Sequence, residues 1–171
     1  VDTKHHLIVE HEVTNVGNDR AQLSNMANKA KEIIGCDELQ VAADMGYYKG
    51  EEILACEENG IITYLPRPKT SNNQARGLFA RDDFIYNPED DSYTCPSGEQ
   101  AIYRFSSEEK GKTIRRYWSS ACKKCPLKEK CTTGENRRIT RWEHEATLDA
   151  LAKRMIENPE AMKIRKSTVE H

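Results

Sequence analysis

The stretch that decides the fold is LQVAADMGYYKGEEILACEENGIITYL, residues 39–65. Its first part, residues 39–44, is apolar and leads into a turn, so it predicts a buried strand. Residues 49–59 place apolar side chains at helical spacing, and Gly60 ends the predicted helix. Residues 61–65 are rich in β-branched side chains and predict a second strand. A strand, a helix and a strand in this order are typical of an α/β layer whose sheet is at least partly parallel.

The residues before this stretch extend the same pattern. Leu7–Thr14 is short and rich in β-branched residues, and a turn cluster follows it, so we expect another strand there. Asn18 or Asp19 can cap a helix that carries apolar residues at spacings of three and four and ends at Gly35. Residues 1–65 are therefore expected to form the first part of an α/β core.

The chain changes character after this part. Pro66–Arg81 contains many turn formers and shows no hydrophobic period, so it is expected to be a loop. Short aromatic segments then predict a small antiparallel β unit, with strands at Phe84–Tyr86, Ala101–Phe105 and Thr113–Trp118.

Helical spacing resumes near the end of the chain. Trp142–Asn158 predicts one helix, and Pro159 stands at the first position of a further helix that runs to Glu170. We therefore expect a core in two parts, residues 1–65 and residues 142–171, with a β insert at residues 66–141 between them.

Composition narrows the possible functions. The chain has 171 residues, of which 37% are apolar and 32% charged. The sequence holds no run of 18 or more apolar residues and opens with no signal-like leader, so we expect a cytoplasmic protein without a membrane span. Because it begins at Val1 without a Met and ends at His171 within a helical pattern, we expect a chain truncated at both ends.

The charge is distributed unevenly. The formal net charge of -2 argues against a uniformly basic protein, but Arg104–Arg141 carries 12 Lys or Arg against 4 Glu. Such a stretch indicates either a solvated surface or a surface for nucleic acid. The pair Tyr117-Trp118 within it is more typical of packing than of base stacking.

Four of the six cysteines fall in the predicted insert. Cys122 and Cys125 form a C-x2-C pair, Cys131 follows, and Cys95 lies in a turn upstream. Four thiolates are the ligand set of a closed structural zinc site, and a small β unit with few aliphatic residues gains stability from such a metal. Two disulfides, or a redox-active or unligated pair, are the alternatives.

Two carboxylates are candidates for catalysis. Asp44 follows the first strand of the opening stretch, at the sheet edge where α/β folds place their sites, although an Asp in this position is also a common turn former. Glu170 lies on the last predicted helix, where by itself it resembles any exposed helical glutamate.

Taken together, these segments resemble the catalytic region of DDE-type insertion-sequence transposases, in the branch whose core is interrupted by a cysteine-bearing β insert. The resemblance covers nearly the whole chain in element order. The segments that carry it are Lys4-His-His-Leu-Ile-Val with His11-Glu-Val-Thr-Asn-Val-Gly and Asp19-Arg, Ala43-Asp44-Met-Gly46-Tyr47 with Gly50-Glu-Glu-Ile, Cys95-Pro-Ser-Gly-Glu, Cys122-Lys-Lys-Cys125-Pro-Leu with Cys131-Thr, Arg141-Trp-Glu-His, and Arg165 to His171.

The resemblance implies a ribonuclease H-like mixed sheet with helices, interrupted by the small zinc-binding insert. In this family two aspartates and one glutamate hold two Mg²⁺ or Mn²⁺ ions. Asp44 would match the second acid and Glu170 the third, while the first is expected upstream of Val1. Asp2 is the nearest acid to that position, but its sequence context indicates a hairpin turn.

The implied function is DNA transposition and recombination by two-metal-ion cleavage and joining of DNA. The implied partners are transposon ends and target DNA, a homodimer or higher oligomer of the full-length protein, and no membrane. Lys163, Arg165 and Lys166 would offer positive charge to the DNA backbone. We expect this chain alone to be inactive.

Two other functions stay open from the sequence. One is a non-enzymatic, zinc-stabilised DNA-binding module that uses the basic stretch. The other is a thiol redox protein that uses Cys122 and Cys125.

Overall fold

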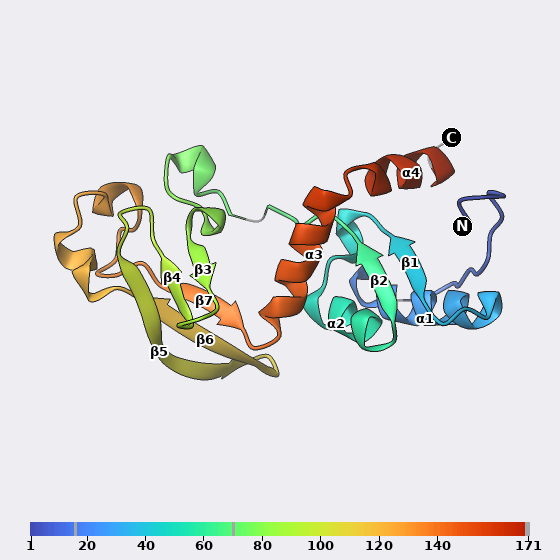
Figure 1. The fold of residues 1–171 in the computed structure, drawn as a ribbon, viewed down its shortest axis with the longest axis horizontal. Coiled ribbons are helices and arrows are strands. Elements are labelled where there is room, and N and C mark those ends of the chain that lie inside the picture. Colours follow the sequence, from blue (N-terminus) through green and yellow to red (C-terminus); the bar gives the residue numbers. More distant parts are fainter. Residues whose placement is uncertain (16, 70, 170–171) are drawn as a thin grey trace. The chain divides into compact units, whose positions relative to one another are not determined.

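The computed structural model describes residues 1–15, 17–69 and 71–169, and it divides the chain into two units. The core unit comprises Val1–Pro68 and the chain from His144 onward, and the insert unit comprises Lys69–Glu143. Their elements are drawn in Figure 1. In the part of the chain described, no helix combines the length and the apolar character needed to cross a membrane.

The core unit is built from helices around a small parallel sheet. β1 and β2 pair in parallel, from Leu39 opposite Ile61 to Ala42 opposite Tyr64, which confirms the prediction for residues 39–65. The elements are η1 (Asp19–Ala21), α1 (Leu23–Ile34), β1 (Leu39–Ala42), η2 (Met45–Tyr47), α2 (Gly50–Glu58), β2 (Ile61–Tyr64), α3 (Glu145–Glu157) and α4 (Glu160–Val169).

The ends of these elements follow from local chemistry. The Asn18 side chain accepts a hydrogen bond from the Arg20 backbone N–H and so caps η1, one turn before α1. Gly35 has a φ of 69° and ends α1 in the left-handed conformation that glycine adopts without a steric penalty. The predicted helix is therefore confirmed, with a short 3-10 turn at its start. β1 alternates between half-buried and exposed residues, so it is not the fully buried strand that was expected.

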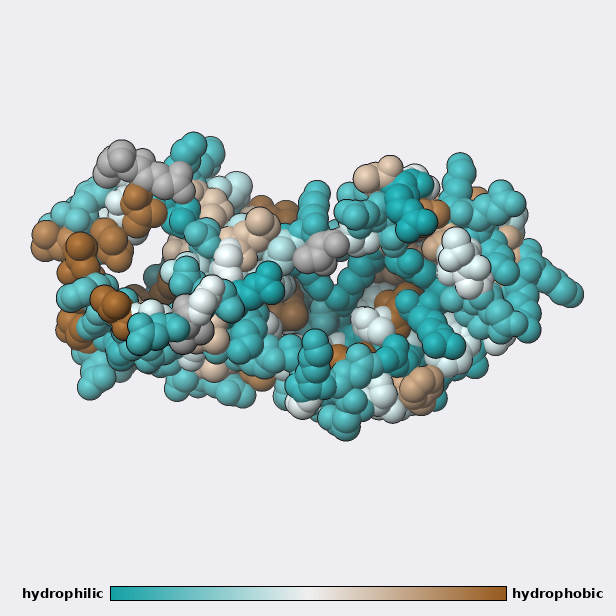
Figure 2. All heavy atoms as spheres, turned by 180° about the vertical axis from the view of Figure 1, so that it is seen from behind, coloured by the Kyte–Doolittle hydropathy of each residue, from teal (hydrophilic) through white to brown (hydrophobic). Residues whose placement is uncertain are grey.

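The strand predicted at Leu7–Thr14 is wrong. This segment forms no strand and leaves Leu7, Ile8 and Val13 largely exposed. Its β-branched residues favour an extended backbone, but a strand needs a neighbour to hydrogen-bond with, and none of the described strands pairs with it. Apolar residues gather over this end of the core unit, which also carries α1 (Figure 2).

The centre of the core unit lies where α2 and α3 pack beside β2 (Figure 1). Ile53 and Cys56 of α2 are fully buried, and Leu151 of α3 is almost fully buried. Arg154 of α3 donates to both carboxylate oxygens of Glu57, at 2.7 and 3.3 Å, and to the backbone oxygen of Thr63 at 2.9 Å. This arginine therefore ties the last part of the chain to the first.

A second ion pair joins two segments of the core unit that are far apart in sequence. Arg67 lies just before the insert unit and Glu145 just after it, and both belong to the core unit. The Arg67 guanidinium lies 3.3 Å from the Glu145 carboxylate, which is only 5% exposed. This pair therefore links, within the core unit, the two chain segments that flank the insert unit in sequence.

The insert unit is a five-stranded antiparallel sheet in the order β3-β4-β5-β6-β7. Its elements are η3 (Gln74–Arg76), η4 (Arg81–Asp83), β3 (Ile85–Asn87), β4 (Ser92–Thr94), β5 (Gln100–Glu109), β6 (Lys112–Trp118), η5 (Ser120–Lys124), η6 (Lys128–Lys130) and β7 (Ile139–Trp142). The antiparallel arrangement was expected, but β4 and β7 were not, and Trp142 belongs to β7 rather than to the following helix. The described strands form two sheets, the parallel pair of the core unit and the antiparallel sheet of the insert unit. Pro66 lies two residues after the last residue of β2 and lacks the N–H that a longer strand would need there.

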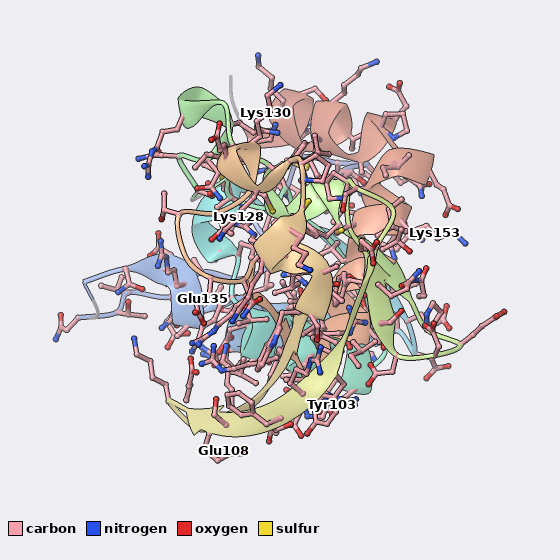
Figure 3. The ribbon with its side chains drawn as sticks, turned by 90° about the vertical axis from the view of Figure 1, so that its left-hand side faces the viewer. Tyr103, Glu108, Lys128, Lys130, Glu135 and Lys153 are labelled. Carbon is pink, nitrogen blue, oxygen red and sulfur yellow. The ribbon has the colours of Figure 1, made fainter. Side chains whose placement is uncertain are left out.

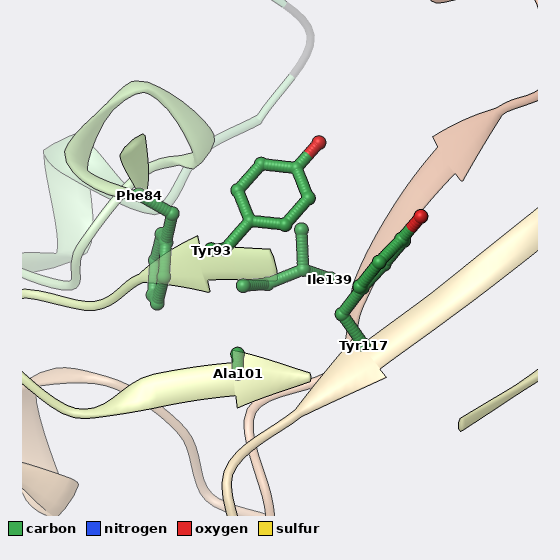
Figure 4. Close-up of a cluster of buried hydrophobic side chains, with 5 residues drawn as sticks. All are labelled: Phe84, Tyr93, Ala101, Tyr117 and Ile139. Atoms are coloured by element: carbon green, nitrogen blue, oxygen red, sulfur yellow. The ribbon is translucent and has the colours of Figure 1, made fainter. Parts of the chain in front are cut away.

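One face of this sheet carries a small aromatic core. Its buried side chains are Phe84, Tyr93, Ala101, Tyr117 and Ile139 (Figure 4). The rings of Tyr93 and Tyr117 meet edge to face, with centroids 5.2 Å apart.

A single carboxylate organises the tyrosines at the edge of this core. Asp91 has a φ of 50°, a left-handed conformation that aspartate tolerates better than most residues. Its Oδ1 accepts hydrogen bonds from the hydroxyls of Tyr86, at 2.8 Å, and Tyr117, at 2.9 Å. Its Oδ2 pairs with Arg115. Burial, and next the hydrogen bond to Asp91, raise the pKa values of both tyrosines.

Candidate functional site

Asp44 stands where β1 ends and η2 begins, at the sheet edge where it was expected. Its Oδ1 accepts the backbone N–H of Gly46 at 2.7 Å, so the carboxylate caps the short η2 turn. A Cβ on Gly46 would lie 2.9 Å from that oxygen, so any larger residue would displace the carboxylate. Asp44 is therefore a turn former, as the alternative interpretation had it, but its side chain remains 49% exposed.

The second oxygen of Asp44 faces helix α4. Arg165 lies 3.4 Å from Oδ2, and its own side chain is only 19% exposed. Thr168 is buried, and its hydroxyl donates to the Ile164 backbone oxygen at 2.8 Å. The last described turn of α4 therefore packs beside the acid that ends β1.

A pocket of about 520 Å³ in the core unit contains this pair. Asp44, Arg165, Thr168 and Val169 all line it, together with apolar residues of α1 and β1. Glu170, the expected third acid, follows Val169 directly but lies outside the described residues. The structure thus brings the chain next to Glu170 into the pocket that holds Asp44.

Other acidic groups contribute to the charge of this pocket. Asp2 lines it, but its carboxylate accepts the backbone N–H groups of Lys4, at 3.1 Å, and His5, at 2.8 Å. These backbone hydrogen bonds, that of Lys4 first, lower the pKa of Asp2 and hold it in a local turn. Burial raises the pKa of the nearby Tyr47 hydroxyl, and the charges of Asp19 and Asp44 raise it further.

The three cations expected to contact DNA divide between two faces of α4. Lys163 is 73% exposed and lies 2.8 Å from the Glu160 carboxylate, and Lys166 is also exposed. Arg165 instead turns inward to Asp44. Successive helical residues are rotated by about 100°, so Arg165 cannot share the outer face of Lys163 and Lys166.

The four cysteines expected to bind zinc line one small pocket in the insert unit, of about 30 Å³. Cys122 lies in η5, Cys125 and Cys131 follow η5 and η6 directly, and the Cys95 Sγ lies 3.1 Å from the Ser97 hydroxyl. Burial raises the pKa of Cys131, and the negative charges of the other three thiolates would raise it further, while Arg137 lowers it. All four thiols are free.

Neither cluster forms a complete metal cage in the described arrangement. In residues 1–15, 17–69 and 71–169, no three His, Cys, Asp or Glu side chains are placed so as to hold one metal ion. The four insert cysteines line one pocket, but their sulfur atoms do not converge on a single metal position in the described residues.

Comparison with known proteins finds a similarity that covers the C-terminal part of the chain. Residues 94–171 match the family model described as a transposase DDE domain. This part of the chain is similar to transposase DDE domains. The matched segment starts beside Cys95 and includes most of the insert unit as well as α3 and α4. No curated protein and no solved structure matches the chain.

The family match agrees with the resemblance drawn from the motifs. It supports a role in DNA cleavage and transposition and makes DNA the expected substrate, and proteins of this family generally use Mg²⁺ or Mn²⁺. Sequence reasoning missed Gly46 as the residue that leaves room for the Asp44 carboxylate, although an Asp-x-Gly turn after a strand was visible. It also missed the contact between Arg165 and Asp44, for which no local pattern exists.

Proposed function

We propose that this chain is part of the catalytic domain of an insertion-sequence transposase, in which the core unit forms a ribonuclease H-like core and the insert unit interrupts it. Such a domain would cleave and join DNA by two-metal-ion phosphodiester transfer in the cytoplasm. The observation that supports this proposal is the approach of α4, within the matched segment, to Asp44 at the end of β1.

In this proposal Asp44 and Glu170 hold the divalent ions. The residues fit that role, because carboxylate oxygens are the ligands that Mg²⁺ and Mn²⁺ prefer, and because the Asp44 Oδ2 takes no hydrogen bond from the adjoining turn. When bound, two ions would activate a water or a DNA 3′-hydroxyl and stabilise the departing oxygen.

The protein groups around Asp44 prepare it for this task. Gly46 fixes one carboxylate oxygen through its N–H, which leaves the other pointing to α4. Arg165 balances the charge of that second oxygen and would turn to a DNA phosphate when the carboxylate binds metal. Lys163 and Lys166, on the exposed face of α4, would contact the DNA backbone.

The experiment uses a transposase that contains this segment. Asp44→Asn and Glu170→Gln should each abolish strand cleavage in Mg²⁺ while DNA binding is retained, because each removes a metal ligand and leaves the fold intact. Glu160→Gln, an exposed acid on the same helix, is the matched control and should cleave normally. Normal cleavage by the Asp44 variant would refute the proposal. Since the resemblance implies a further acid beyond these two, we propose that the chain alone does not cleave DNA.

We also propose that Cys95, Cys122, Cys125 and Cys131 bind one structural zinc ion. Four thiols around one hollow match the donor set of a closed zinc site, and a cation among them would offset the mutual repulsion of the thiolates. Purified protein should contain one zinc per chain. Cys122→Ser should lose the zinc, whereas Cys36→Ser, which alters a thiol of the core unit outside this pocket, should keep it. A zinc-free protein with four reactive insert thiols would contradict the assignment.

The second candidate is a non-enzymatic DNA-binding module stabilised by zinc. The basic stretch Arg104–Arg141 in the insert unit favours it. This function needs neither Asp44 nor Glu170, so DNA binding without any cleavage by the full transposase would favour it. The enzyme as proposed acts as a homodimer or higher oligomer on transposon ends and target DNA.

A further inference from the structure

The outer face of the insert sheet, opposite the aromatic core, carries a second group of aromatic residues. Side chains alternate between the faces of a strand, so Arg116 and Trp118 of β6 point away from the side on which Tyr117 is buried. On β5, Phe105 pairs with Arg116 and Ile102 pairs with Trp118. Phe105 and Ile102 are 45% and 47% exposed, which is high for large apolar side chains.

Arginines lie over these rings. The Arg104 and Arg138 guanidinium carbons lie 5.4 and 5.8 Å from the centre of the Trp118 ring. The Arg116 guanidinium lies 5.9 Å from the centre of the Phe105 ring, and the two rings meet edge to face with centroids 6.0 Å apart. We call Arg104, Phe105, Arg116, Trp118 and Arg138 the arginine–aromatic face.

Most of the positive charge on this face is not neutralised. In the described part of the chain neither Arg104 nor Arg138 forms an ion pair. Arg104 donates instead to the Trp118 backbone oxygen and the Ser120 hydroxyl, which fixes its position. Arg116 pairs with Glu109, a carboxylate that is 49% exposed. Tyr103 and Glu108 of the same strand also reach the surface (Figure 3).

A nucleic acid strand is the partner that fits this combination. A guanidinium that lies over an aromatic ring can still direct N–H groups to phosphate oxygens. Arg104 uses its Nε and one Nη for Trp118 and Ser120, which leaves its other Nη for a phosphate. Exposed flat rings between cations stack on bases, and they do so best when the bases are unpaired. A protein partner would gain from the apolar rings but would have to desolvate three arginines, so the charge favours a polyanion.

We propose that the arginine–aromatic face binds DNA, with Arg138, Arg104 and Arg116 on the phosphates and Phe105 stacked on an unpaired base. This inference takes its ligand from the proposed function, but it concerns a surface of the insert unit and not the Asp44 pocket. It assigns the insert a role in holding the DNA strand during the reaction.

The test measures DNA binding by the intact chain without divalent metal, using fluorescence anisotropy of a labelled oligonucleotide as single strand and as duplex. The single strand should bind more tightly. Arg138→Gln should weaken binding to both forms by about 3- to 10-fold and reduce the dependence of log K on log salt by roughly 0.7 for the single strand. Phe105→Ala should weaken single-strand binding by about 5-fold or more and leave duplex binding nearly unchanged.

Two controls make the outcome decisive. Arg20→Gln removes the same charge from an exposed site of the core unit and should leave binding unchanged. Arg138 is exposed and makes no hydrogen bond that positions the backbone, so its variant should melt like the unmodified protein. Unchanged DNA binding by both Arg138→Gln and Phe105→Ala would overturn the proposal, as would a Phe105→Ala variant that changes only the oligomeric state. Because Asp44 is untouched, such a result would leave the proposed catalytic function standing.

Discussion

Replacing Asp91 by alanine should strongly lower the stability of the insert unit. Asp91→Ala deprives the Tyr117 and Tyr86 hydroxyls of their shared acceptor and Arg115 of its ion pair. Hydrogen bonds to a charged group contribute about 1.5–3 kcal/mol each, while the partly exposed ion pair adds little. Because alanine also tolerates the left-handed backbone less well, we expect the free energy of unfolding to fall by about 3 kcal/mol.

Intrinsic fluorescence measures this loss selectively. Both tryptophans of the chain, Trp118 and Trp142, lie in the insert unit, so tryptophan emission during urea or thermal unfolding reports on that unit. At roughly 4–8 °C per kcal/mol for a domain of this size, a loss of about 3 kcal/mol should lower the midpoint by about 12–24 °C. Asp91→Asn keeps a residue suited to the backbone conformation and one acceptor oxygen, and should lose about 1 kcal/mol. A midpoint for Asp91→Ala that matches the unmodified protein would refute the assignment of Asp91 as the organiser of the tyrosines.

Three further predictions concern other contacts. Arg154→Met should lower the free energy of unfolding of the core unit by about 2 kcal/mol, as measured by far-UV circular dichroism, because it removes the ion pair with Glu57. Lys153→Met, at the adjacent exposed position, should change this free energy little. Equal effects of the two substitutions would contradict the role of the Glu57 pair. The raised pKa of Tyr117 means that the folded state holds the hydroxyl proton more tightly than the unfolded state does. The free energy of unfolding should therefore fall as the pH rises above about 10, where an unfolded tyrosine loses its proton. Urea titrations should show a smaller fall for Tyr117→Phe, which has no hydroxyl to ionise. Cys56, fully buried with a pKa of about 12, should resist alkylation in the native protein at mildly alkaline pH and react in urea, as mass spectrometry can show; rapid native labelling would disprove its burial.

The sequence predicted best where local chemistry decides the structure. α1 ends at Gly35 and α2 ends at the Asn59-Gly60 turn, because glycine at these positions favours the backbone conformation that ends a helix. Both glycines could be identified from the sequence. The short strand Ser92–Thr94 was missed because three residues with little apolar content give no periodic signal. Leu7–Thr14 was assigned as a strand from its composition, but pairing is a long-range event that composition does not contain.

The candidate site divides in the same way. The place of Asp44 at the end of a strand followed from the sequence, because the strand and the turn are local. Its contact with Arg165 joins residues 121 positions apart and depends on how α4 packs, so no spacing rule could have revealed it. The cysteines were expected to gather, and they do line one pocket, but their spacing alone did not fix their geometry.

The salt bridge between Arg67 and Glu145 has a consequence for the history of the molecule. The ion pair holds together the two ends between which the insert unit is placed in the sequence. The core unit should therefore tolerate changes in the length of that insert. During evolution the insert could become longer, be exchanged or be lost while the Arg67–Glu145 pair and the core unit are retained.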